Sequence, residues 1–584
     1  MDRPTADRPG SGEQVGRIDP LVGVPDRAAA DAGHPADTVS DGGARGRTSA
    51  PVVQLDTDGE VDHHVPVDGT GGHPDGLEPD GLEPDGARVR WSRDPRTWPR
   101  SFAAAVGAMT IWQWVLVALV AGYTSYFTSV TLDVHHGLGT SAYDYGLYDQ
   151  GMWLMSRFDA PFVTLMGRNL IGDHTSFILV FLIPIYWVFP SAGALFFTQS
   201  LMIALGAVPV YLLARRRIGN ELFAVALAGC YLIHPAVAWT NRENFHPDSY
   251  LAPLVGMAIY GAVERKWRTY AVFFVLALMV KEDVSLVLVP LGVWVTLKRD
   301  RRIGILSVVG AVSFMLAAML LVKRSLIGVP TRNFWRIPFG GPTGFLRTVF
   351  TDPIAVVRHY WSDNRPFYFW QMTAPLAWVF ARAPSVALIS FVVMGTNMLS
   401  TFWYQYQIEY HYSLVAVPGL VMGTVWAISK VAERWRGALV AAVLATSLWT
   451  SWSWGAMPYS KELPYTWAPD HPVAVDARDI IRDIPADAVV SAQYSITAHL
   501  ARRHEIYMFP NPFSLTLYGT DDSLAGQRLP AADRVEYVVL PATLEFESEM
   551  VWNVVSSEFT LVDSNQWWRL YQRTTMLDQP NPAP

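Results

Sequence analysis

Residues 269–298 read TYAVFFVLALMVKEDVSLVLVPLGVWVTLK, and two apolar runs in this stretch flank the charged tripeptide Lys281-Glu282-Asp283. Each run is shorter than the roughly 20 residues that an upright helix needs to cross a bilayer, so tilted helices or helices ending in protein-lined cavities are expected. An ionisable group at membrane depth costs roughly 2.5–3.5 kcal/mol unless it pairs or lines a wet cavity. The stretch therefore predicts two membrane helices joined by a polar turn.

Apolar runs of this kind repeat from residue 102 to residue 454. Of the 584 residues, 51% are hydrophobic and only 17% are charged, whereas soluble proteins contain about 25% charged residues. The sequence predicts an all-α polytopic membrane protein with about eleven transmembrane helices. The predicted spans cover residues 102–130, 194–214, 220–240, 248–263, 269–283, 284–297, 303–323, 366–381, 384–403, 411–429 and 437–454.

The loops between these spans can be assigned to the two sides of the membrane by their Arg and Lys content. Positive clusters lie at 88–100, 215–217, 264–268, 298–302 and 430–436. The positive-inside rule places them in the cytoplasm, which makes the N-terminus cytoplasmic and the C-terminus extracytoplasmic in a plasma membrane. An odd number of crossings must then precede the cluster at 215–217, so the run at 176–190 is predicted to be an interfacial helix on the outer face.

Composition divides the chain into three parts. Residues 1–87 hold 18 Asp and Glu against six Arg and no Lys, and we expect residues 1–95 to be a disordered, acidic, Gly/Pro-rich cytoplasmic tail. Residues 96–455 form the transmembrane domain, with a first outer loop at 131–193. The single cysteine, Cys230, excludes a disulfide framework and Cys-based zinc or iron–sulfur sites.

The remaining residues, 456–584, mix helix-like and strand-like patterns. The stretch 475–484 is helix-like, residues 488–490 and 535–540 are strand-like, and a second helix-like stretch runs up to Arg503. We predict a small extracytoplasmic α/β domain. The abundance of Gly, Pro, Ala and Arg is typical of a high-GC bacterium such as an actinomycete.

In this topology the unusual polar residues gather on the outer face, in four separate loops. The chemistry-bearing residues of these loops are Asp144, Asp149, Asp173 and His174 in the first, Arg242, Glu243, His246 and Asp248 in the second, Lys281, Glu282 and Asp283 in the third, and Glu409 and His411 in the fourth. A solvated face would scatter charges of both signs and many Lys. The convergence instead predicts a binding or catalytic site.

Each of these polar motifs also has a purely structural interpretation. Lys281-Glu282-Asp283 can be a salt-bridged turn, and His234-Pro235 is typical of a helix end. The adjacent His135 and His136 do not face one another on a helix, which argues against a metal pair. No Ser-based triad motif, GxxxxGK[ST] or GxGxxG is present. The remaining polar residues suit a different chemistry. A carboxylate would act as general base on a hydroxyl, and Lys, Arg and His groups would hold a phosphate.

The order of these parts resembles the GT-C superfamily of polyprenyl-phosphate-sugar-dependent membrane glycosyltransferases. More specifically, YGLYDQGMW, GDHTSF, NFHPD, VKEDVSL and AHLARR, which lie within about 140–510, are similar to the bacterial family called domain of unknown function 2079. The resemblance implies a GT-C-like fold and a catalytic Asp in the first outer loop. Because Asp144 is followed by Tyr145 and not by a second acid, the choice between Asp144 and Asp149 stays open.

These observations lead to the hypothesis of an inverting glycosyltransferase that moves a sugar from a polyprenyl-phosphate donor to an acceptor at the outer face. Asp144 or Asp149 would deprotonate the acceptor hydroxyl. Lys281 and Arg242, with His174, His246 or His411, would bind the phosphate. The other acids of the outer loops would bind sugar hydroxyls or orient the cations. A divalent metal is compatible with this scheme but is not required by it.

The expected partners are the lipid-linked donor, membrane lipid, and a cell-envelope glycan, lipid or protein as acceptor, with no nucleic acid. The competing hypothesis is a transporter or flippase for a lipid-linked or amphiphilic substrate, whose path the same groups would line. Transporters commonly show internal repeats and midplane sites. The spans show no repeat, and the polar groups cluster at one interface, which favours the enzyme over both a transporter and a non-catalytic scaffold.

Overall fold

The protein is described by a computed structural model that defines residues 98–464 and 466–577. Helix α1 (Trp98–Gly107) is part of one compact unit, and the residues from Met109 onward form a second. The predicted acidic tail at 1–95 lies outside the described residues.

The first long helix, α2 (Ile111–His136), begins where Thr110 and Gln113 form a capping box. The predicted span at 102–130 is therefore wrong at its start, because residues 108–110 interrupt the helix. It is also wrong at its end, because α2 continues to His136. The ring of His135 is buried and stacks on His499 of the C-terminal domain, with ring centroids 4.2 Å apart. This tertiary contact favours an extra turn of helix where the sequence predicted a loop.

Four helices in the described residues are long and apolar enough to cross a membrane: Ile111–His136, Ala192–Ile218, Arg301–Ile327 and His411–Ser429. A fifth candidate is the pair α8 (Glu221–Leu232) and α9 (Pro235–Arg242), which is bent by 50°. The bend falls at His234-Pro235 and confirms the helix end predicted there.

The predicted number of about eleven spans is not confirmed, because several of the predicted spans form short helices. Helices α11 (Trp267–Leu278) and α12 (Ser285–Lys298) have 12 and 14 residues. At a rise of about 1.5 Å per residue, they are about 18 and 21 Å long, which is less than the roughly 30 Å thickness of a hydrocarbon core. The polar turn expected between them is present as the 3₁₀ turn η6 (Glu282–Val284).

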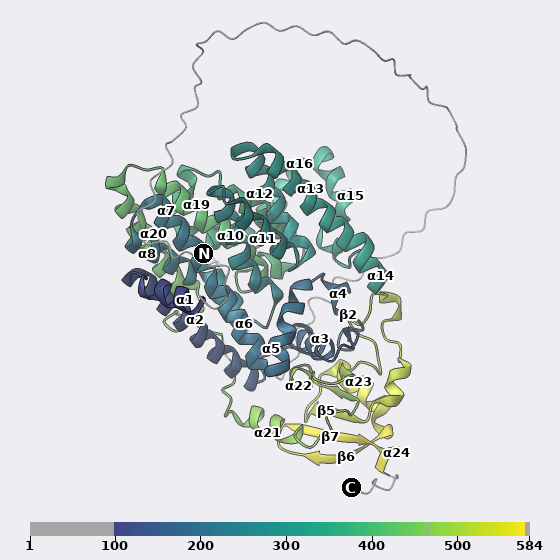
Figure 1. Cartoon of the computed structure of the whole chain (residues 1–584). Helices are drawn as coiled ribbons and strands as arrows, with labels where there is room; N and C mark the ends of the chain where they lie inside the picture. Colours follow the sequence, from purple (N-terminus) through teal and green to yellow (C-terminus); the bar gives the residue numbers. More distant parts are fainter. Residues whose placement is uncertain (1–97, 465, 578–584) are drawn as a thin grey trace, which may run out of the picture. The chain divides into compact units, whose positions relative to one another are not determined.

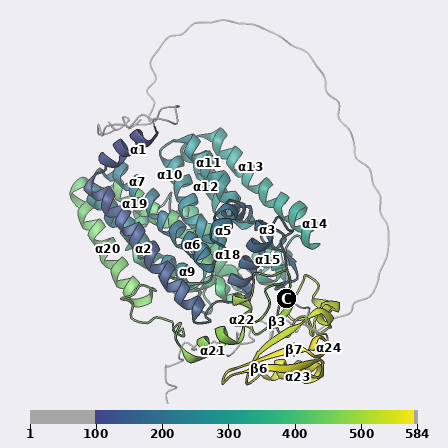
Figure 2. The same cartoon turned by 60° about the horizontal axis from the view of Figure 1, so that its bottom comes forward.

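The helical region also contains several further helices and turns. Its other helices are α3 (Leu147–Ser156), α4 (Leu170–Asp173), α5 (Ile183–Val188), α6 (Ala192–Leu205), α7 (Ala207–Ile218), α10 (Leu251–Val263), α13 (Arg301–Ala317), α14 (Arg324–Ile327), α15 (Gly341–Thr351), α16 (Pro353–Tyr360), α17 (Arg365–Thr373), α18 (Leu388–Leu399), α19 (Val417–Ser429) and α20 (Glu433–Trp454). Helix α2 packs along α6, and α12 packs along α13, as Figure 1 shows. Helix α20 packs on α8. Figure 2 shows α20 along the left edge of the helical region.

The segment predicted to be interfacial folds as a 3₁₀ turn, η4 (Phe177–Leu182), followed by α5. Together they span 12 residues, too few to cross a bilayer as a helix. Phe181, Trp187 and Val188 are exposed, as expected of a segment that lies on a membrane surface. Its placement at the outer interface stays a prediction.

The predicted C-terminal α/β domain contains a mixed five-stranded sheet with the order β4-β3-β5-β7-β6. Strand β3 pairs in parallel with β4 and β5, whereas β7 pairs antiparallel with β5 and β6. The elements of this domain are α21 (Pro472–Ile480), β3 (Val490–Ala492), α22 (Tyr494–His499), β4 (Ile506–Met508), β5 (Tyr537–Pro541), α23 (Phe546–Val555), β6 (Phe559–Ser564), β7 (Trp568–Arg573) and α24 (Thr574–Leu577). The two strands predicted from sequence correspond to β3 and β5. The other three were not predicted.

Hydrogen bonds attach the first loop to this domain. The side chain of Gln150 donates to the carbonyl oxygen of Arg503 at 3.2 Å. The Thr164 hydroxyl donates to the carbonyl oxygen of Ile506 at 2.7 Å and accepts the Ile506 N–H at 2.9 Å. The hydroxyl of Tyr143 donates to the carbonyl oxygen of Leu517 at 3.3 Å. The C-terminal domain therefore fixes the loop that carries Asp144.

Candidate functional site

Polar side chains from the four predicted outer loops meet in one place. We call this group the four-loop cluster, and its members are Asp144, Glu243, His246, Asp248, Lys281, Asp283 and His411. Close polar contacts connect Asp144 to His246 of the second loop and Glu243 of that loop to His411, and an ion pair connects Asp248 to Lys281. The convergence predicted from sequence is thus present in the fold.

Asp144 lies in a π-helical turn, η3 (Ala142–Gly146), which begins at Ser141. The Ser141 hydroxyl donates to Asp144 Oδ2 at 2.9 Å, and the Ser141 N–H donates to the side-chain oxygen of Asn244 at 2.9 Å. The second of these bonds ties the first loop to the second. Asp144 Oδ1 lies 3.6 Å from Nε2 of His246, and 37% of the Asp144 side chain is exposed. The carboxylate is therefore held in position while one edge stays accessible.

Glu243, His246 and His411 form the buried part of the cluster. The Glu243 carboxylate accepts the backbone N–H of His411 at 2.7 Å and lies 3.3 Å from His411 Nδ1. Its Oε1 is 3.7 Å from His246 Nε2, and the two imidazole rings stack with centroids 3.7 Å apart. Burial raises the pKa of Glu243 to about 8. Burial and the neighbouring His411 lower the pKa of His246 to about 4.

Lys281 contributes a positive charge to the cluster. Its ammonium group lies 3.5 Å from Asp248 Oδ1 and 3.5 Å from Asp283 Oδ2, and its side chain is almost fully buried. It also lies 5.7 Å from the ring centroid of Tyr412. The predicted salt-bridged turn is therefore present, and the same lysine belongs to the convergent site.

Arg336 borders the cluster and was not predicted from sequence. Its guanidinium lies 4.2 Å from the ring centroid of Phe402 and 5.9 Å from that of Tyr412, the ring that also lies 5.7 Å from the ammonium group of Lys281. Its Nε has no hydrogen-bond partner among the described residues. Because Arg336 lies outside the four acidic segments of the sequence, only the aromatic residues around 402–412 could have indicated it.

Asp149 is placed differently from Asp144. Its carboxylate is buried, accepts the Tyr186 hydroxyl at 2.7 Å and pairs with the Arg502 guanidinium at 3.1 Å. Both oxygens are thus occupied by partners, one of them from the C-terminal domain. Arg502 lies in the AHLARR segment noted in the sequence, but its pairing with Asp149 was not predicted.

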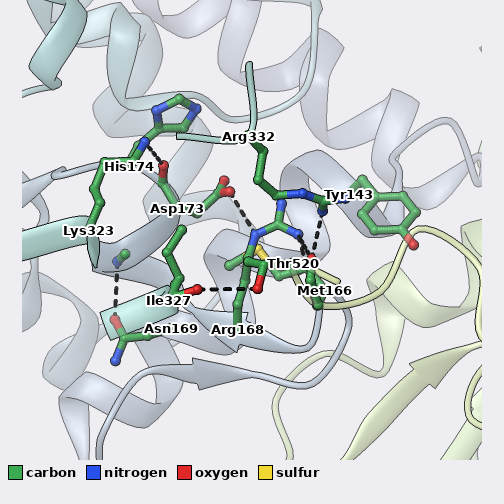
Figure 3. A network of polar contacts seen from close by, with 12 residues as sticks. Tyr143, Met166, Arg168, Asn169, Asp173, His174, Lys323, Ile327, Arg332 and Thr520 are labelled. Atoms are coloured by element: carbon green, nitrogen blue, oxygen red, sulfur yellow. Dashed lines mark hydrogen bonds and ion pairs between the residues drawn. The ribbon is translucent and has the colours of Figure 1, made fainter. Parts of the chain in front are cut away.

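Asp173, His174 and Glu282 belong to a neighbouring network of ion pairs. Figure 3 shows Asp173 and His174 in this network. Arg168 pairs with Asp173 at 2.7 Å, and His174 Nδ1 lies 3.2 Å from Glu282. Lys323 donates to Glu282 at 2.7 Å and to the backbone carbonyl oxygen of Asp173 at 2.6 Å. The network joins the first loop to the third and thereby positions the turn that carries Lys281. Lys323 was missed because its partner Glu282 is 41 residues away in sequence.

Arg242 and Glu409 belong neither to the four-loop cluster nor to the network around Glu282. The Nε of Arg242 and the Oε2 of Glu409 have no hydrogen-bond partner among the described residues. Burial raises the pKa of Glu409.

The fold is similar to that of ArnT from Cupriavidus metallidurans. The apo structure of ArnT aligns with a TM-score of 0.50 and 12% identity over 82% of this chain and 100% of ArnT. ArnT from the same organism bound to undecaprenyl phosphate aligns with a TM-score of 0.49 and 12% identity over 81% and 100%. No curated protein matches the sequence. At this identity, the likeness to the apo structure shows a common fold.

The family resemblance noted in the sequence is confirmed by a direct match. Residues 134–550 match the family described as "Predicted membrane protein (DUF2079)". The matched range contains every predicted site residue as well as AHLARR in the C-terminal domain. The chain therefore belongs to the DUF2079 family of predicted membrane proteins, and it has an ArnT-like fold.

Proposed function

We propose that this protein is a membrane glycosyltransferase that transfers a sugar from a polyprenyl-phosphate donor to a hydroxyl acceptor at the outer face of the membrane. The ArnT-like fold and the sequence resemblance to GT-C glycosyltransferases support the general kind of enzyme. The observation that carries the proposal is the meeting of four separate loops around Asp144 and Lys281. In such an arrangement the carboxylate can act as the general base, and the cation can bind the phosphate of the donor in the same reaction.

Asp144 serves as the general base in this proposal. Its carboxylate is partly exposed, whereas that of Asp149 is occupied by Tyr186 and Arg502. Asp144 takes the proton of the acceptor hydroxyl as the hydroxyl oxygen attacks the anomeric carbon. The bond between that carbon and the phosphate oxygen breaks, and its electron pair leaves with polyprenyl phosphate. Attack opposite the leaving group inverts the anomeric configuration.

Lys281 and Arg336 are the proposed ligands of the leaving phosphate. Both flank the ring of Tyr412, and Arg336 has an unpartnered Nε. Positive groups aimed at the phosphate stabilise the charge that develops on it in the transition state. Asp248 and Asp283 keep the ammonium group of Lys281 in place.

An apolar groove provides room for the lipid tail of the donor. It has a volume of about 630 Å³ and runs along α12 from Ser285 to Lys298, between α13 and α18. Ser285 follows Asp283 by two residues, so one end of the groove lies next to the four-loop cluster. The lining includes Val289, Val293 and Val392, which suits an isoprenoid chain whose phosphate reaches Lys281.

The test is an assay of the purified full-length protein with a panel of polyprenyl-phosphate sugars and a cell-envelope extract as acceptor. We expect release of polyprenyl phosphate with one donor of the panel. Movement of an intact lipid-linked sugar across proteoliposomes, without release of polyprenyl phosphate, would contradict the proposal and support the transporter. Absence of both release and movement with every donor would also contradict it.

A further inference from the structure

Three buried side chains of the four-loop cluster supply the donor atoms of a metal site. Glu243, His246 and His411 each offer one ligand atom, and these atoms all lie within 4.8 Å of one another. Glu243 and His246 come from the turn after α9, and His411 begins the 3₁₀ turn η12 (His411–Ala416). We propose that these three residues bind one divalent zinc ion, and that this ion helps to hold the phosphate of the donor.

Two of the three separations between the donor atoms are close to those around a single tetrahedral ion, and the third is at most 4.8 Å. Glu243 is 3.3 Å from His411 Nδ1 and 3.7 Å from His246 Nε2. Atoms that bind one tetrahedral ion at about 2.1 Å lie about 3.4 Å apart. The two His–Glu separations bracket this value, so a central ion could reach all three groups with small side-chain movements.

His246 provides an independent observation that points to a ligand. Its Nε2 is buried and has no hydrogen-bond partner among the described residues. The two nearest carboxylates, those of Asp144 and Glu243, are 3.6 and 3.7 Å away, which is too far for a hydrogen bond. A buried polar atom without a partner destabilises the folded state. Metal coordination would use the Nε2 lone pair and remove this cost.

Surrounding groups hold the donor atoms in place. The backbone N–H of His411 donates to Glu243 Oε2 at 2.7 Å, and the backbone N–H of His246 donates to the Gln199 side chain at 2.9 Å. Outer hydrogen bonds of this kind orient the ligands of metal sites. Asp144 remains outside the three-ligand set, 3.6 Å from His246 Nε2. Three protein ligands leave one position of a tetrahedral ion open.

The charge of the cluster explains why a cation is needed there. By its definition the cluster contains four carboxylates and one ammonium group, and Arg336 at its border adds one positive charge. With neutral imidazoles, and with Glu243 deprotonated as metal ligation requires, the formal sum is −2, which opposes binding of an anionic phosphate. One divalent ion brings this sum to zero. This part of the inference rests on the proposed function, because only a phosphate-bearing donor requires the cancellation.

The donor set selects the kind of metal. Two imidazoles and one carboxylate are typical ligands of zinc, whereas Mg²⁺ and Ca²⁺ prefer sites made wholly of oxygen atoms. Thiolate ligation is absent from this arrangement, since Cys230 is buried within α8. We therefore expect a zinc site with nitrogen and oxygen ligands and one open position.

The experiment uses the full-length protein in detergent, stripped with a chelator and titrated with Zn²⁺ alone. Elemental analysis should find about one zinc per chain, and X-ray absorption should show only nitrogen and oxygen neighbours at about 2.0–2.1 Å. His246→Ala and His411→Ala should each weaken zinc binding at least tenfold. His504→Ala, an exposed histidine that pairs with Asp159, is the matched control and should bind zinc as the wild type does.

A second measurement separates loss of the site from loss of the fold. Glu243→Gln preserves side-chain shape, so its elution as a single species with unchanged thermal midpoint in chelator would show that it folds. Added Zn²⁺ should raise the thermal midpoint of the wild type but not that of Glu243→Gln, because a ligand of the folded state stabilises it. Equal zinc binding by the wild type, His246→Ala and His411→Ala would overturn the site, as would sulfur in the ligand shell.

The role of the ion is tested apart from its binding. Donor turnover by the wild type should fall at least tenfold after zinc removal and recover when zinc is restored. Full turnover by the zinc-free protein would overturn the role in phosphate binding while leaving the proposed transferase intact. The protein could also bind one zinc ion at these ligands and turn over no donor. That result would contradict the proposed function but would support the zinc site.

Discussion

Asp144 Oδ1 lies 3.6 Å from His246 Nε2, although the two residues are 102 positions apart in the sequence. This contact joins the first outer loop to the second and places a partly exposed carboxylate beside a buried imidazole. The N–H of Ser141 reinforces the junction by donating to Asn244. The first and second outer loops therefore position the Asp144 carboxylate together.

Lys281 is expected to be needed for turnover as well as for folding. Lys281→Gln leaves Asp248 and Asp283 without their cation, so we expect lower thermal stability and a loss of turnover of about a hundredfold, typical for removal of a transition-state charge partner. The matched variant is the double substitution Lys281→Gln with Asp248→Asn, which lowers the charge imbalance. Donor kinetics and thermal unfolding check both effects. Recovery of stability without turnover supports a role in the reaction, and recovery of both would assign Lys281 a purely structural role.

Asp149 and Arg502 are expected to stabilise the attachment of the C-terminal domain to the first loop. Arg502→Gln should destabilise the protein by about 1–3 kcal/mol, because Asp149 is left buried with an incomplete set of partners. The single variants and the double variant with Asp149→Asn form a cycle, read by denaturant unfolding in detergent. Because the two residues act as a pair, we expect the double variant to be no less stable than either single variant. Strictly additive losses would show that the pair contributes little.

His499 is expected to make the protein sensitive to acid. Burial and the positive charges nearby lower its pKa from 6.5 to about 4. Between pH 6.5 and 4 the unfolded chain binds a proton at this residue and the folded chain does not, so the free energy of unfolding decreases as the pH falls. The contribution is at most about 3 kcal/mol.

The measurement is the thermal midpoint between pH 7 and pH 4.5. His499→Phe keeps a ring against His135 and should reduce the loss of stability in acid. His504→Phe is the control on an exposed histidine and should follow the wild type. The same pH profile for the wild type and His499→Phe would show that the buried ring does not govern the acid response.

The groove along α12 is expected to bind the lipid tail. Val293→Trp fills the groove and should raise KM for a long-chain donor about tenfold, since loss of buried apolar contact for one or two methylene groups costs roughly 1–2 kcal/mol. A short-chain analogue that does not reach Val293 should be unaffected. Val272→Trp, on the exposed face of α11 and outside the groove lining, is the control. An equal change for both chain lengths would contradict this role.

Part of the site could be predicted from sequence because charged groups in apolar surroundings are costly. Lys281 and Asp283 stand out in a stretch that is otherwise suited to lipid, and the positive-inside rule assigned them to the same face as Asp144. The structure brings these residues together. The orientation of that face relative to a membrane stays a prediction.

The rest depends on contacts between distant residues, which a single sequence does not display. Asp144 and Asp149 look equivalent in sequence. They differ in the structure because Asp149 pairs with Arg502, which lies 353 residues away in the sequence. Helix lengths were also mispredicted, because the end of α2 depends on the contact of His135 with His499. Hydropathy likewise cannot tell a short helix ending inside the protein from a complete crossing.

The central claim is that Asp144 is the base of a glycosyl transfer. Its most direct test is release of polyprenyl phosphate by the purified wild type, Asp144→Asn and Asp149→Asn under single-turnover conditions. Asp144→Asn should remain folded and lose at least a hundredfold in rate, because general base catalysis contributes about 10²–10⁴-fold. Wild-type rates for Asp144→Asn with an inactive, folded Asp149→Asn would move the base to Asp149. Wild-type rates for both variants would contradict the mechanism.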